Sequence, residues 1–221
     1  EGKDGWYSSD VTIQNKAVAG QNNAWGALQF SGSPAGDFAD SYTVTTEGEN
    51  NTTIWFRQTT TEYIGSQDKE IKIDKTAPTW PENGGISVKE NWWKKLVNTI
   101  SFGLFYKDAT VDVKVCAKDN LSGIDAYYYY VDTTGSTTVL SSDVLDTRNF
   151  TKVDGFGAQT LISLDSENKY VVYAYAIDNA GNRSDYVCSD GVVLDRTAPT
   201  ISGITVPSKS DLTLTDTSAK I

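Results

Sequence analysis

Carboxylate and amide side chains gather on two short turns and at two strand ends of this sequence. The turn residues are Asp119, Asn120, Asp125, Asp178, Asn179 and Asn182, and the strand-end residues are Asp74 and Asp195. Hard cations such as Ca²⁺ take six to eight oxygen ligands of this kind, so the pattern indicates a calcium site built from Asp119, Asn120, Asp178, Asn182 and Asp195. Asp, Asn and Gly are also the residues that tight turns require, and EF-hand spacing is missing, so turn formation alone is the simpler explanation.

Clustered aromatic residues offer a second kind of binding chemistry. Trp92 and Trp93 are adjacent on a segment with near-helical spacing, and Tyr127–Tyr130 lie on one expected strand. An exposed ledge containing Trp92, Trp93, Tyr128 and Tyr130 could stack on a sugar ring or anchor a protein partner. Packing in the core and across strands explains the same residues more simply.

The residue inventory argues against catalysis and against nucleic acid. The chain has no histidine, which removes Ser-His-Asp and Cys-His nucleophile systems. No glycine-rich phosphate loop follows a strand, and we expect no catalytic residues and no enzyme activity. The net charge of −10 offers no basic surface for phosphates, and no run of 18 apolar residues could span a membrane.

The only two cysteines, Cys116 and Cys188, could form one disulfide bond if the protein is extracellular. Such a bond would close a loop of roughly 70 residues and add about 4 kcal/mol to stability. The alternative is two buried free thiols that behave as small apolar side chains. We predict the disulfide.

Short strands must position these groups. Thr, Val, Tyr and Trp alternate in short runs separated by Asn, Asp, Gly and Ser, and this pattern predicts a β-sandwich. The expected strands are 10–15, 25–30, 41–46, 51–58, 70–74, 111–118, 126–133, 160–163, 169–178 and 187–194.

Tyr170–Ile177 is apolar or aromatic on both faces, which predicts a central strand. Short helices are expected at Asn91–Asn98 and, over one end of the sandwich, at Ser142–Arg148.

The tetrapeptide Thr-Ala-Pro-Thr occurs twice, each time after an apolar run and an Asp-Lys or Asp-Arg pair. With the apolar run and the Asp pair included, the two copies are Ile71–Thr79 and Val192–Thr200. Proline restricts its own φ and holds the preceding residue extended, so each copy predicts a stiff joint between modules. We therefore expect a module at 1–78, a larger one at 79–199, and at 200–221 the start of a third module or a C-terminal extension.

The two joints and the turns Asp119–Ile124 and Asp178–Ser184 together resemble the tandem immunoglobulin-like modules of Gram-positive surface proteins, which are similar in fold to fibronectin type III modules. The first module resembles this family through Gly5–Thr12 and Tyr42–Gly48. It departs from the family before its last strand, where Thr59–Ser66 stands in place of the Asp-Asn-Ala-Gly-Asn turn. The resemblance implies two tandem all-β sandwiches with the first strands of a third. It also implies an extracellular location at the cell surface or wall. Calcium bound at turns or joints is known in some modules of this kind.

From this resemblance we expect a non-catalytic spacer in a longer surface or secreted protein, with neighbouring modules of the same polypeptide as its partners. One alternative is an adhesin module that binds a host glycan or a host protein such as immunoglobulin. Another is an accessory module of a secreted glycoside hydrolase. No cofactor other than calcium is expected.

Overall fold

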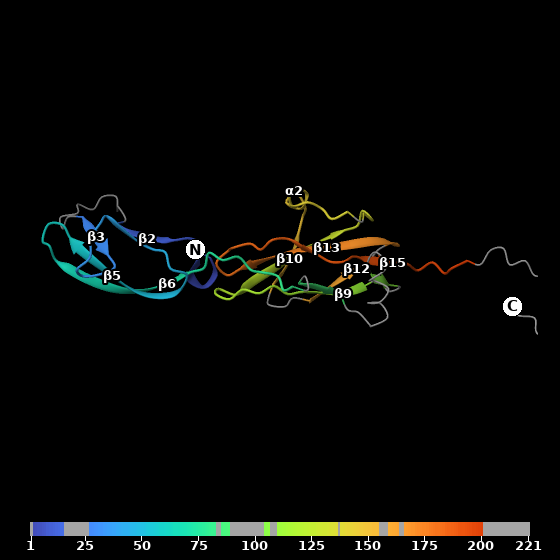
Figure 1. Ribbon diagram of the computed structural model, residues 1–221, viewed down its shortest axis with the longest axis horizontal. Coiled ribbons are helices and arrows are strands. Elements are labelled where there is room, and N and C mark those ends of the chain that lie inside the picture. The colour runs from blue at the N-terminus through green and yellow to red at the C-terminus, as the bar shows by residue number, and fades with distance from the viewer. Residues whose placement is uncertain are drawn as a thin grey trace, which may run out of the picture.

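The chain folds into two separate sets of β-sheets that lie end to end (Figure 1). The computed structural model describes residues 2–15, 27–82, 85–88, 104–106, 110–136, 138–154, 159–163 and 166–200. No strand before residue 74 pairs with a described strand after it. The prediction of an all-β, immunoglobulin-like architecture is confirmed. No helix in these ranges is long and apolar enough to cross a membrane.

The N-terminal unit, as we call the first set, contains strands β1 to β6. Their bounds are β1 Trp6–Tyr7, β2 Val11–Gln14, β3 Leu28–Ser31, β4 Ser41–Val44, β5 Gly48–Gln58 and β6 Ile64–Ile73. One sheet has the order β1-β6-β5-β3, and the other pairs β2 with β4. Alternate residues of both sheets meet in a core of Phe30, Val44, Ile54, Ile71 and Ile73. The unit is thus a small sandwich.

Among the described residues, the C-terminal unit contains the remaining strands and one short helix. They are β7 Ile86–Val88, β8 Leu104–Tyr106, β9 Thr110–Val115, β10 Ile124–Asp132, α2 Ser142–Leu145, β11 Thr151–Asp154, β12 Gln159–Ser163, β13 Asn168–Asp178, β14 Val187–Cys188 and β15 Val192–Leu194. The larger sheet has the order β11-β10-β13-β15-β8, with β14 also on β13, and the smaller has the order β12-β9-β7. Between them lies a core that includes Val113, Val115, Tyr127, Val172 and Leu194.

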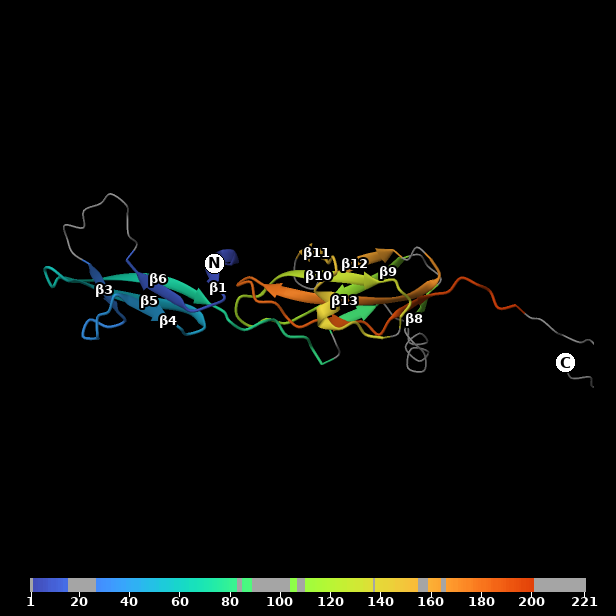
Figure 2. The ribbon, with the colours of Figure 1, turned by 90° about the horizontal axis from the view of Figure 1, so that it is seen from above.

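Strand β13 is central, as its sequence predicts, because both of its faces are covered. Tyr170 and Val172 face the core between the sheets. Val171 and Tyr173 face outward and pack with Leu145 of α2. The helix was expected over one end of the sandwich. It instead helps to cover the outer face of the larger sheet (Figure 2).

The observed strands overlap the expected ones but differ from them in several places. The expected strand 187–194 is interrupted and forms β14 and β15, and the short strands β7 and β11 are not expected from the sequence. The described pieces β1 and β8 are only two and three residues long, too short to show alternation, and each joins its sheet by a parallel pairing. The expected turn Thr59–Ser66 is shorter, because β6 already begins at Ile64. The expected helix Asn91–Asn98 lies outside the described residues.

The predicted disulfide is not formed, and Cys116 and Cys188 are both free. Cys116 lies between Val115 and Ala117, which point into the core between the sheets, so its own side chain points away. Cys188 packs on the outer face of the other sheet with Leu145 and its neighbours. The two thiols therefore lie on opposite sides of the sandwich, which the sequence spacing does not reveal.

Candidate functional site at the joint between the units

Asp74 follows the last residue of β6 and forms the centre of the joint. Its side chain is fully buried, with 0% exposed, and its backbone N–H donates to Tyr7 O at 2.9 Å. Oδ1 accepts the N–H of Thr76 at 3.0 Å, which closes a turn at the start of the joint. Oδ2 accepts the N–H of Ser122 in the C-terminal unit at 2.9 Å. One carboxylate thus shapes the end of one unit and binds the other.

Two turns of the C-terminal unit present the complementary groups. Asp119 Oδ1 accepts the N–H groups of Leu121 and Gly123 at 3.1 and 2.6 Å, and so orders the turn that carries the Ser122 N–H. Asp178 Oδ1 accepts two N–H groups of the turn 179–182 at 2.7 and 2.8 Å. Both are turn roles that Asp fills by accepting local backbone N–H groups.

Asn182 connects the second turn to the joint. Its side-chain nitrogen donates to the Asp74 carbonyl oxygen and to Asp178 Oδ2, both at 2.8 Å. Asn179 ties the two turns together, since its side-chain nitrogen donates to Ser122 O at 2.6 Å. The joint is therefore bonded through both backbone and side chains.

The chain start adds a further contact at the same place. Lys3 donates its backbone N–H to Asn179 O at 2.7 Å and its Nζ to Asp125 Oδ1 at 3.0 Å. Gly2 lies so close that an added Cβ would come within 2.3 Å of Asn179 O, so only glycine fits there. Figure 1 shows the N-terminus between the two sets of sheets.

Three carboxylates meet at this joint. Asp74, Asp119 and Asp178 each have an oxygen within 4.8 Å of the other two, and Asp74 and Asp178 are 0% and 1% exposed. Among the described residues, none of the three forms an ion pair with a lysine or arginine. Burial raises the pKa of Asp178, the Asp74 charge raises it further, and hydrogen bonds from Asn182 and Gly181 oppose the increase.

The donor set of this cluster is made of oxygen alone. Carboxylate oxygens suit hard cations such as Ca²⁺, whereas soft ions prefer thiolate and imidazole. Asp119 Oδ2 accepts no hydrogen bond from the described residues, and Asn179 Oδ1 is buried without a hydrogen-bond partner. A divalent cation at the cluster would offset the crowded negative charge.

The structure brings together only part of the predicted ligand set. Asp119 and Asp178 meet, and Asn182 adjoins them, but Asn120 is exposed. Asp195 lies outside the cluster, because it follows Leu194, which pairs with Asn168 at the opposite end of β13. Ten residues of strand separate these ends by roughly 33 Å. Asp74, from the first joint, occupies the place expected for Asp195.

The aromatic residues form a packed layer rather than an open ledge. Tyr128 stacks on Tyr175 with centroids 4.8 Å apart, and Tyr130 contacts Phe150 and Tyr173. Both predicted tyrosines are half-buried in these contacts. The other predicted pair, Trp92 and Trp93, lies outside the described residues.

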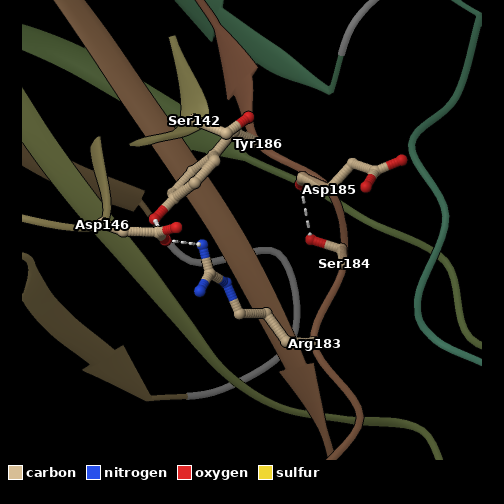
Figure 3. Close-up of a pocket in the computed structure, with 6 residues that line it drawn as sticks. All are labelled: Ser142, Asp146, Arg183, Ser184, Asp185 and Tyr186. Atoms are coloured by element: carbon tan, nitrogen blue, oxygen red, sulfur yellow. Dashed lines mark hydrogen bonds and ion pairs between the residues drawn. The ribbon is translucent and has the colours of Figure 1, made fainter. Parts of the chain in front are cut away.

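An arginine at the edge of this layer borders a cavity of about 390 Å³ (Figure 3). The Arg183 guanidinium lies 4.4 Å from the ring centre of Tyr175 and 4.3 Å from that of Tyr186. Asp146 accepts hydrogen bonds from the Tyr186 hydroxyl at 2.7 Å and from Arg183 at 3.1 Å, and these lower its pKa. The sequence does not reveal this group, because Asp146 and Arg183 are 37 residues apart.

Comparisons with known proteins find similar solved structures but no match by sequence. No protein-family model matches the sequence, and no curated protein matches it. The chain is similar to a structure of the fibronectin(III)-like modules of Clostridium thermocellum CbhA, with 8% identity, 91% of this chain and 95% of that chain covered, and a TM-score of 0.43. It is also similar to the D00-D0 domain of intimin, with 12% identity, coverage of 85% and 95%, and a TM-score of 0.28. The immunoglobulin-like assignment rests on the strand order of the two units.

Proposed function

We propose that this chain is a non-catalytic spacer within a multidomain cell-surface or secreted protein, built from tandem modules at 1–78 and 79–199 and a third that begins at 200. The observation that carries the proposal is the buried carboxylate of Asp74, which closes the joint on one unit and accepts a hydrogen bond from the other. A chain of such units extends a functional domain away from its attachment point.

The bonds across the joint oppose bending. Rotating one unit away from the other would break the bonds to Ser122 N and from Asn182 Nδ2, and would move buried polar groups into a new environment. Leaving one such group unpaired costs about 1–3 kcal/mol. Pro78 is itself buried in the joint and restricts the backbone there. The units therefore keep one relative orientation.

We propose that Ca²⁺ stiffens the same joint by binding Asp74, Asp119 and Asp178. The ligands come from both units, so the ion would cross-link them. Its two positive charges would favour the ionised form of Asp178, whose pKa is raised by burial and, to a smaller extent, by the Asp74 charge. Mg²⁺ is the weaker fit because it demands near-ideal octahedral geometry and keeps its waters.

Small-angle scattering of the full chain and of Asp74→Ala tests the spacer. We expect an extended particle, and in the variant a broader distribution of distances between the two units. Asp143→Ala, which removes an exposed carboxylate from α2, serves as the control and leaves the distribution unchanged. A compact parent particle, or an Asp74→Ala curve identical to the parent's, would contradict the spacer function.

Isothermal titration with CaCl₂ tests the ion separately. We expect one site per chain, weakened at least tenfold in Asp119→Asn and in Asp178→Asn. Asp125→Asn is the matched control, because Asp125 lies beside the turn but pairs with Lys3 and Lys152. Binding that survives both cluster substitutions would exclude this site while leaving the hydrogen-bonded joint intact.

A second candidate function is adhesion, and the cavity beside Arg183 favours it. Tyr186 presents a ring and Arg183 and Asp185 present charges at its walls, a combination that suits a host glycan or protein. A glycan and serum-protein binding screen of the chain and of Tyr186→Ala tests it. Binding lost in the variant supports adhesion, and no binding by either protein rejects it.

A further inference from the structure

The two Thr-Ala-Pro-Thr joints repeat each other in three dimensions. At the first, Glu47 Oε1 accepts the N–H of Lys75 and the hydroxyl of Thr76, while Asp74 Oδ1 accepts the Thr76 N–H at 3.0 Å. At the second, Glu167 accepts the N–H of Arg196 and the Thr197 hydroxyl, each at 2.8 Å. Asp195 Oδ1 accepts the Thr197 N–H at 3.0 Å. Each of these three bonds at the first joint has its counterpart at the second.

The strands that hold the two carboxylate pairs are also equivalent. Gly48, directly after Glu47, pairs with Ile73, and Asn168, directly after Glu167, pairs with Leu194. In both units a parallel strand pairs with the last strand. A tyrosine of that parallel strand is paired with the residue directly before the Asp of the joint. Tyr7 is opposite Ile73, and Tyr106 is opposite Leu194. The repeat therefore extends from the tetrapeptide to the frame that supports it.

The two joints differ in whether another unit covers the Asp residue. Asp74 is fully buried because Oδ2 receives the Ser122 N–H from the next unit, and Pro78 is buried with it. Asp195 and Pro199 are exposed, and no described residue donates to Asp195 Oδ2. The second joint thus has the shape and bonding of the first without the unit that covers it.

We propose that Asp195 and Glu167 form the acceptor end for a further β unit that begins at Thr200. Thr79 is the residue of the first joint that corresponds to Thr200. It forms an antiparallel β-bridge with Lys118 of the C-terminal unit, so that unit starts at the end of the tetrapeptide. The partner is identified by its chemistry. It carries an Asp-containing turn whose backbone N–H binds Asp195 Oδ2, and a second turn whose Asn amide binds the Asp195 carbonyl oxygen, in the roles of Ser122 and Asn182.

This inference rests on the proposed spacer function and adds a direction to it. The N-terminal unit presents a carboxylate at the end of its last strand, and the C-terminal unit receives it on the turns at 119–123 and 179–182 while presenting its own carboxylates after β15. Contacts of this head-to-tail kind use two different surfaces, so they can continue from one unit to the next.

The C-terminal unit supplies a donor surface already known to fit such an acceptor. An extended chain in which residues 80–200 are repeated after Thr200 brings a second Ser122 and Asn182 to Asp195. Small-angle scattering of this chain should give a length that grows by one unit in a straight line. Asp195→Ala should broaden the distances between the second and third units as Asp74→Ala broadens those between the first two.

Two controls make the result decisive. In the original chain Asp195 is exposed, so Asp195→Ala should leave the melting temperature within a degree of the parent's, which shows that the variant folds. Asp143→Ala should leave the extended chain straight. If Asp195→Ala scatters like its parent while Asp74→Ala does not, the acceptor end is refuted and the spacer stands. If neither variant changes the curve, the spacer function itself is refuted.

Discussion

Asp74 and Asp178 are buried together at the joint, and both accept backbone N–H groups that shape turns. At Asp178 these hydrogen bonds favour the charged carboxylate, whereas its burial and the nearby Asp74 charge disfavour it. The pKa of Asp178 is raised, so burial and the Asp74 charge prevail there.

We expect the stability of the calcium-free chain to depend on pH through Asp178. Its pKa in the folded state is raised above the ordinary 3.8, so the folded chain binds this proton more tightly than the unfolded chain. The contribution of Asp178 to the free energy of unfolding therefore rises as pH falls through the raised pKa, and levels off below 3.8. Urea denaturation of the wild type and of Asp178→Asn between pH 7 and pH 4 measures it as the difference between the two proteins.

The opposite dependence is expected with calcium present. The ion binds only ionised carboxylates, so the stability that it adds falls as pH falls. In the absence of calcium, the free energy of unfolding of the wild type minus that of Asp178→Asn should grow toward low pH. A difference that shrinks toward low pH would show that burial and charge do not destabilise ionised Asp178.

At the scale of elements, the short helix α2 and the loops around it give the larger sheet a second covered face. Leu145 is 2% exposed and packs with Val171 and Tyr173 on the outer side of β13. Leu140 N donates to the Tyr173 hydroxyl at 3.0 Å, so this layer also satisfies a buried polar group. A four-residue helix has little stability of its own, and its position depends on this packing.

We expect Leu145→Ala to lower the free energy of unfolding by about 2–5 kcal/mol, because it leaves a cavity on the outer face of β13. Val144→Ala is a matched control on the same helix, where the side chain is 37% exposed, and should change stability by less than about 0.5 kcal/mol. Urea denaturation followed by circular dichroism compares them. Equal effects of the two substitutions would mean that α2 does not cover a core.

At the scale of the whole molecule, the joint couples the folding of the two units. The hydrogen bonds of Asp74 with Ser122 and Asn182 exist only when both units are folded, so each unit stabilises the other. The contact of Lys3 with Asn179 and Asp125 adds to this coupling from the start of the chain.

Asp74→Ala should therefore separate the thermal unfolding of the two units. Calorimetry of the parent is expected to show one main transition, or two that overlap closely, and the variant should show two resolved transitions with the lower one shifted down by several degrees. Asp195→Ala is the control because it removes the equivalent carboxylate at the exposed joint. Unfolding profiles that match between Asp74→Ala and the parent would indicate that the units fold independently.

The sequence by itself determined the local features of this protein. Alternating apolar residues set most of the strands, the two covered faces of β13 follow from Tyr170–Ile177, and the first copy of the repeated tetrapeptide marks the joint between the two units. These features depend on neighbours within a few residues, where side-chain direction follows from backbone geometry.

Only the tertiary structure decided which distant groups meet. It brought Asp74 rather than Asp195 to Asp119 and Asp178, placed Cys116 and Cys188 on opposite sides of a sandwich, and set Arg183 between Tyr175 and Tyr186. The physical reason is that both Asp residues have the same local sequence and the same position after the last strand of their own unit, so only the packing of the C-terminal unit on the first joint distinguishes Asp74 from Asp195. A strand of ten residues separates its ends by roughly 33 Å, and no local pattern encodes which end faces a neighbour.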